Sequence, residues 1–173
     1  MYMAESIVNY LLDLFSGLTS LKFGKEILVF IISMLPILEL RGGLIAASLL
    51  GLKAVPSFII CFIGNIIPIP FILWLITPIF DYLKRKTKLK GFVEKIETKA
   101  MNKKDKIEKL EYIGLFLFVG IPLPGTGAWT GCLIASLLGL DKKKSFIASI
   151  LGVILAGIIM LILSYGVIGN LIK

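Results

Sequence analysis

The sequence contains no histidine, only two cysteines and few charged residues, and each scarcity excludes a class of chemistry. Charged side chains make up 17% of the 173 residues. Without histidine the chain lacks the usual proton carrier at neutral pH and the commonest metal ligand. Cys61 and Cys132 both lie in apolar runs, where we expect them to pack as small hydrophobic side chains. We therefore predict no disulfide, no metal site and no cofactor.

Enzymatic activity is the least expected function for this composition. The chain has no Cys–His pair, and Glu39 is the single carboxylate placed well inside an apolar segment. General acid–base catalysis needs a second group that accepts or returns the proton. We predict neither catalysis nor a nucleic-acid partner.

Apolar residues are abundant instead. They form 57% of the chain, and the mean hydropathy of +0.95 lies outside the range of soluble domains. Four runs, at 27–52, 56–80, 113–140 and 145–168, are each long enough to cross a hydrocarbon core of about 30 Å. The sequence thus predicts an all-α integral membrane protein.

Before these runs, a helical spacing of apolar residues predicts an amphipathic helix over 1–22 in the membrane interface, formed by Ile7, Leu11, Leu14, Phe15 and Leu18.

The chain repeats itself at an offset of 88 residues. "ASLLGL" occurs at Ala47–Leu52 and again at Ala135–Leu140. In the same register Phe30 matches Phe118, Leu35-Pro36 matches Leu123-Pro124, Gly43 matches Gly131, Ser57-Phe58-Ile59 matches Ser145-Phe146-Ile147, and Gly64 matches Gly152. Matched proline, glycine and serine positions indicate a duplication. The repeats are predicted over 26–80 and 112–170 of a single membrane domain.

Each repeat begins with short apolar arms interrupted by proline and glycine. Glu26–Leu35 and Ile113–Ile121 are only about half as long as the hydrocarbon core when helical, so each can enter the membrane and return. If these parts are re-entrant hairpins, each repeat has one transmembrane helix and the two repeats are inverted. If each is a continuous kinked helix, the repeats are parallel and four helices cross the membrane.

Charge distinguishes the two topologies. The linker 81–111 holds 11 of the 19 Lys and Arg residues and is predicted to be cytoplasmic. Only inverted repeats also place "DKKK", Asp141–Lys144, in the cytoplasm, so we favour two inverted units of hairpin and transmembrane helix.

Apolar residues recur at helical spacing in the linker, at Phe92, Val93, Ile96 and Ala100. They suggest an amphipathic helix on the inner leaflet, either a solvated connector or a site for anionic lipid.

The stretch "LPILELRGG", Leu35–Gly43, carries the candidate site of the first repeat. Glu39 and Arg41 follow the helix break at Pro36 and are followed by Gly42 and Gly43. Ionisable groups and irregular backbone occur at membrane depth where protein or a watery cavity surrounds them. The pair either neutralises itself and closes the hairpin, or it binds a substrate or an ion. Asn65, in the following helix, could add an amide.

The second repeat offers an uncharged tip. Its breaks are Pro122 and Pro124, and its candidate binding residues are Pro124, Gly125, Thr126, Gly127, Trp129 and Thr130. Glycine backbone amides at a helix start can bind an anion, threonines add hydroxyls, and a tryptophan ring can stack on a ligand. The alternative is a tight turn whose residues serve geometry alone. In inverted repeats the two tips would form one central site near the membrane midplane.

The motifs "ELRGGLIAA", Glu39–Ala47, and "PLPGTGAWTG", Pro122–Gly131, resemble the small multidrug export protein family of prokaryotic membrane proteins. The chain is more distantly similar to the DedA/VTT superfamily, whose members have paired re-entrant hairpins, embedded acidic and basic residues and lipid-transport activity. Glu39 and Arg41 match its charged positions by type. The further arginine usual near its second hairpin is missing here. The resemblance implies a multi-pass protein of the prokaryotic cytoplasmic membrane.

These observations lead to three functional hypotheses. The first is a transporter, proton- or cation-coupled through Glu39, that moves a lipid phosphate such as undecaprenyl phosphate, as the DedA likeness implies. The second is an exporter of small lipophilic cationic drugs, and the third is a membrane-organising protein that transports nothing. For an anionic headgroup Arg41 would bind, and for a cation Glu39 with Trp129. The expected partners are membrane lipid, the substrate, and a second copy in a homodimer.

Overall fold

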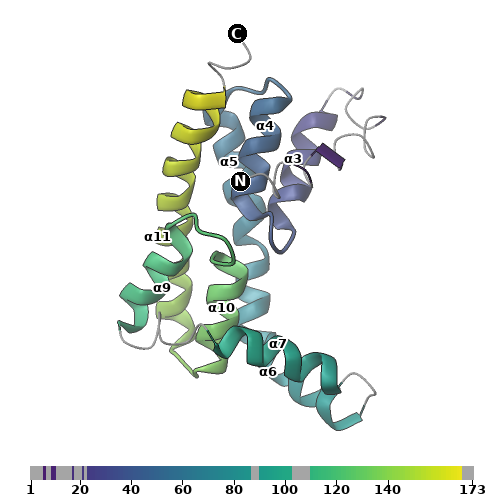
Figure 1. Cartoon of the computed structure of the whole chain (residues 1–173), viewed down its shortest axis with the longest axis vertical. Coiled ribbons are helices and arrows are strands. Elements are labelled where there is room, and N and C mark those ends of the chain that lie inside the picture. Colours follow the sequence, from purple (N-terminus) through teal and green to yellow (C-terminus); the bar gives the residue numbers. More distant parts are fainter. Residues whose placement is uncertain are drawn as a thin grey trace. The chain divides into compact units, whose positions relative to one another are not determined.

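The computed structural model describes residues 6, 9–10, 17, 21, 23–86, 90–102 and 110–168. The interfacial helix predicted over 1–22 therefore lies almost wholly outside the described residues. The described part is helical, as expected, with α3 (Gly24–Met34), α4 (Glu39–Leu49), α5 (Ala54–Ile66), α6 (Pro68–Lys86), α7 (Lys90–Met101), α9 (Glu111–Gly120), α10 (Ala128–Leu137), α11 (Lys142–Leu161) and the π-helix η1 (Ile162–Ile168) (Figure 1).

Two helices in the described part of the chain are long and apolar enough to cross a membrane. They are Ala54–Arg85, which combines α5 with α6, and Lys142–Gly166. Contacts divide the chain into two units within these helices: Met1–Ile67 with Val153–Lys173, and Pro68–Gly152. We call them the first and the second unit.

The first unit contains an antiparallel hairpin of α3 and α4, which pack against each other and against α5 (Figure 1). The Lys25 ammonium donates a hydrogen bond to the Leu50 carbonyl at 3.1 Å, which ties the start of α3 to the end of α4. The positive charge of Lys25 is also stabilised by the negative partial charge at the C-terminal end of α4. The chain thus enters and leaves this hairpin at the same end, and the loop at 35–38 forms its tip.

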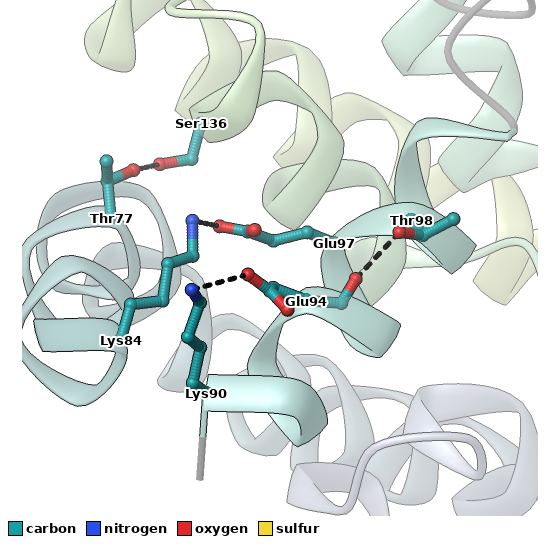
Figure 2. Close-up of polar contacts among 7 residues, drawn as sticks. All are labelled: Thr77, Lys84, Lys90, Glu94, Glu97, Thr98 and Ser136. Atoms are coloured by element: carbon teal, nitrogen blue, oxygen red, sulfur yellow. Dashed lines mark hydrogen bonds and ion pairs between the residues drawn. The ribbon is translucent and has the colours of Figure 1, made fainter. Parts of the chain in front are cut away.

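The second unit contains a matching hairpin of α9 and α10. At its open end the Asp141 amide donates to the Tyr112 hydroxyl at 3.2 Å, and the loop at 121–127 forms its tip. Helix α10 packs on α6, where the Thr77 and Ser136 hydroxyls are 2.8 Å apart (Figure 2). The two units therefore each hold one short-armed hairpin against part of a long helix.

"ASLLGL" ends α4 and α10 in the same way. The amides of Gly51 and Gly139 bond to the carbonyls of Ser48 and Ser136, both at 3.1 Å. The amides of the leucines that follow reach back five residues to Ala47 and Ala135, both at 3.0 Å. This is the Schellman cap, which requires positive φ at the glycine, and Gly51 and Gly139 have φ of 71° and 69°. The repeated letters thus encode a repeated helix end.

The structure shifts the register of the first arms by two residues. A Cβ added at Gly64 would lie 2.8 Å from the Phe30 carbonyl, and one added at Gly152 would lie 2.8 Å from the Phe116 carbonyl. Phe30 therefore corresponds to Phe116, an offset of 86, and not to Phe118. Pro36 accordingly corresponds to Pro122, because each proline is the second residue after its helix. The later loop is longer, which restores the offset of 88 in α10.

In the linker after α6, the described residues of α7 pack against protein. Helix α7 packs on α6 and α10, and Val93 and Ala100 are buried in that contact, whereas Phe92 is 63% exposed. Lys84 on α6 and Glu97 on α7 form an ion pair at 2.6 Å (Figure 2). Two members of the predicted apolar face, Val93 and Ala100, thus contact protein, and a third, Phe92, is exposed.

Candidate functional site

Glu39 is a buried carboxylate at the start of α4. Its exposed fraction is 5%, and its neighbours Leu38 and Leu40 are also buried. Glu39 has a φ of 52°, and its amide donates to the Leu35 carbonyl at 3.0 Å, so the chain turns tightly around it. A carboxylate is favourable at this position because the first turn of a helix carries positive partial charge.

Arg41 is partly exposed and lies two residues further along the helix. Residues two apart point in different directions on a helix, which explains why Glu39 is buried and Arg41 is partly exposed. Burial disfavours the charge of the Arg41 guanidinium, and coulombic attraction to Glu39 offsets part of that cost. The structure thus brings together the two charges that the sequence placed at the tip of the first hairpin.

Backbone strain is concentrated in the loop that precedes Glu39. Ile37 has a φ of 79° and is 84% exposed. A β-branched residue in the left-handed region is an outlier, and such strain recurs at ligand-binding and switch regions. Gly42 and Gly43 are buried, and a Cβ at Gly43 would collide with the Ser33 hydroxyl and lie 2.8 Å from the Cys61 sulfur. Glycine there lets α4 approach both α3 and α5.

Helix α5 presents polar groups to the interior of the first unit and apolar groups to the outside. Ser57, Cys61 and Asn65 recur every four residues and are at most 3% exposed. On the opposite side Val55, Ile59 and Ile63 are 68%, 50% and 49% exposed. This is the reverse of a soluble helix and is typical of one surrounded by lipid.

Asn65 is the predicted site residue whose position is most informative. Its carbonyl oxygen is buried and has no hydrogen-bond partner among the described residues. A buried amide oxygen without a partner costs about 1–3 kcal/mol, so such an atom usually has a ligand or an ordered water. Asn65 therefore adds an available acceptor to the unit that holds Glu39.

Sequence reasoning missed the polar groups that the π-helix η1 contributes to the first unit. Ser164 is fully buried, its hydroxyl has no partner among the described residues, and its carbonyl accepts a bond from Ser48 at 2.8 Å. The Tyr165 hydroxyl is buried close to Ser57 and Cys61. π-helical turns are frequent at functional sites. The available signal was two adjacent polar residues in an otherwise apolar run.

The tip of the second hairpin is organised by Thr126. Its hydroxyl donates to the carbonyls of Leu123 at 2.8 Å and Ile121 at 3.0 Å, and it accepts from the Leu123 amide at 3.3 Å. Gly125 and Gly127 have φ of 75° and 134°, which disfavour any other residue. The hydroxyl of Thr126 thus stabilises the loop, as in the alternative in which the residues of this turn only shape the backbone.

The other candidates of the second tip lie at the start of α10. Pro124 is exposed, while Trp129 and Thr130 are partly buried in the first turn of the helix. Cys132 is buried, with its sulfur 3.2 Å from the Ser149 hydroxyl, and Cys61 is also a buried thiol outside any disulfide. The two tips belong to different units, so their meeting in one central site stays a prediction.

Comparison with known proteins adds one match. Neither the curated proteins nor the solved structures include a significant match to this chain. A family model described as "Putative small multi-drug export protein" matches residues 39–159. The matched region begins at Glu39, directly after the tip of the first hairpin, and includes the tip of the second hairpin, all of the first long helix and most of the second. Because it covers more than half of the chain, and because the long helices suit a membrane, the protein is a membrane protein of the small multi-drug export family.

Proposed function

We propose that the protein exports small lipophilic cations and that the Glu39 carboxylate binds them. The observation that carries this proposal is the burial of Glu39, which is 5% exposed at the tip of an apolar hairpin. A buried carboxylate is stable only with a compensating positive charge or a proton. The export family to which the chain belongs supports the choice of a drug-like cation as the substrate.

Arg41 gives this site a way to release its ligand. In the resting state the attraction between Arg41 and Glu39 compensates the carboxylate. A lipophilic cation replaces that compensation when it binds, and Arg41 or a proton replaces the cation when it leaves. The Asn65 oxygen, buried and available, supplies a second acceptor. Exchange of a proton on Glu39 would couple export to the proton gradient without any histidine.

The proposed topology is a pair of inverted repeats with re-entrant hairpins. Helices α3 and α4 have 11 residues each, about 16 Å at 1.5 Å per residue, which is half of a hydrocarbon core. The bonds that close the open ends of both hairpins support entry and exit on one side. We place the linker 81–111 in the cytoplasm of a prokaryotic cell, with the protein in the inner membrane as a homodimer.

Labelling of introduced cysteines tests this topology. Lys53 and Lys143 are both exposed, and they lie on opposite sides of the membrane if the repeats are inverted. In intact cells a membrane-impermeant maleimide should label Lys53→Cys, whereas Lys143→Cys should react only after permeabilisation. The control, Lys95→Cys on α7, should behave like Lys143→Cys. Labelling of Lys53→Cys and Lys143→Cys from the same side would refute inverted repeats.

Transport of a lipid phosphate is the second candidate, because Arg41 is more exposed than Glu39 and could receive an anionic headgroup. Purified protein in liposomes distinguishes the candidates. We expect it to move a cationic phenanthridinium dye and not a fluorescent polyprenyl phosphate. Movement of the lipid phosphate alone would favour the second candidate. If it moves neither, the protein organises the membrane without transport.

A further inference from the structure

A groove on the second unit lies between α9 and α11, away from the hairpin tip. Its volume is 480 Å³, and its walls are the apolar side chains of Ile113, Phe116, Ile147, Ala148 and Leu151, with Tyr112 and Lys144 also lining it. Ile113, Ile147 and Leu151 are 62%, 58% and 51% exposed, so the groove is open along its outer side. Its apolar walls fit a hydrocarbon chain.

A fixed positive charge lines the same groove. The Lys144 ammonium is 5.6 Å from the centre of the Tyr112 ring, a cation–π arrangement that holds the lysine over α9. The Lys144 amide donates to the Asp141 carboxylate at 2.8 Å, so this acid caps α11. Lys142 and Lys143 belong to the same first turn. The site therefore combines an apolar channel with an excess of positive charge.

We infer that this groove binds one anionic phospholipid, with its phosphate at Lys144 and the upper part of an acyl chain between α9 and α11. Basic pockets beside membrane helices are a recognised mode of anionic-lipid binding. A zwitterionic lipid would leave the lysines uncompensated, and the open outer side lets a chain enter from the bilayer. The inference requires a membrane location but is independent of what the protein exports.

The first repeat provides an internal comparison. With the registers given above, Tyr112 corresponds to Glu26, Lys144 to Pro56 and Ala148 to Ile60. The corresponding position between α3 and α5 thus has a carboxylate and no lysine, and a larger side chain replaces the small one. We therefore expect an anionic lipid at the α9–α11 groove and not at the corresponding position between α3 and α5. Lys53, which precedes α5 and does not line the groove, is the basic residue for a control.

Native mass spectrometry of the full chain in detergent tests this inference. Phosphatidylglycerol and phosphatidylcholine with identical acyl chains are the probes. The wild type should retain one phosphatidylglycerol per chain, and Lys144→Gln should weaken that binding about fivefold and remove the preference, as one lost lysine predicts. Lys53→Gln should bind like the wild type.

A second variant tests the acyl-chain part of the site. Ile147→Ala with Leu151→Ala removes two exposed walls of the groove without opening a core cavity, and it should weaken binding of both lipids. Equal retention of the two lipids by the wild type would overturn the inference. So would a Lys144→Gln variant that keeps the preference, or a Lys53→Gln variant that loses it. None of these results bears on export through Glu39.

Discussion

Replacing Glu39 with glutamine should reduce dye export by at least about 30-fold, because removing one partner of a buried charged contact costs about 2–5 kcal/mol. Glutamine keeps the shape and the hydrogen-bonding oxygen of glutamate but lacks its charge. The substitution therefore separates the electrostatic role from packing at a side chain that is 5% exposed. The measurement is the initial rate of dye efflux from liposomes at a matched amount of protein.

The control for this prediction is Glu26→Gln. Glu26 lies in the first turn of α3, at the open end of the same hairpin, and is only partly buried. The Glu26→Gln variant should keep the wild-type rate of dye efflux, since the proposed site is at the tip of the hairpin. Loss of proton dependence is also expected for Glu39→Gln, because no histidine can replace the carboxylate. Unchanged export by Glu39→Gln would mean that the carboxylate holds the hairpin and binds no substrate.

Alanine at Gly152 or at Gly64 should lower the free energy of unfolding by about 1–3 kcal/mol, as overpacking does in a close-packed core. A Cβ at Gly152 would lie 2.7 Å from the Val119 Cβ and 2.8 Å from the Phe116 carbonyl oxygen. Real Cβ atoms do not come this close, and a backbone oxygen can move only with its helix. In both repeats the first hairpin arm would therefore have to separate from the long helix. Thermal unfolding of the purified protein measures the effect.

Gly91→Ala is the matched control. Gly91 lies in α7 with open space around its added Cβ. This substitution should leave the midpoint of thermal unfolding unchanged or raise the free energy of unfolding by about 0.5–1 kcal/mol, because alanine has a higher helix propensity than glycine. A Gly152→Ala variant as stable as Gly91→Ala would show that α9 and α11 do not touch at this position.

Much of the fold could be predicted because its signals are local. Short arms, proline breaks and "ASLLGL" each define a helix end through hydrogen bonds within a few residues, and the structure contains these helices. Small residues in α11 also make close helix contacts, since Gly152 packs on α9 and Gly157 packs on Phe58 of α5. Small residues mark such contacts because only they let helix backbones come close.

The remaining features depend on contacts between distant segments. The two-residue register shift could not be found by a single offset, because apolar arms align almost equally well at several offsets and the loops differ in length. The buried polar groups of η1 were missed because a serine and a tyrosine near a helix end look like ordinary interfacial residues. Their burial is decided by Ser48 and Ser57, more than 100 residues earlier in the chain.

The most direct test of the central claim is equilibrium binding of a lipophilic cation, tetraphenylphosphonium, to the purified protein. Arg41→Ala removes the group that competes for the Glu39 carboxylate, so this variant should bind the cation at least as tightly as the wild type. Glu39→Gln should bind it at least about 30-fold more weakly. Loss of cation binding in Arg41→Ala together with wild-type binding in Glu39→Gln would contradict the account.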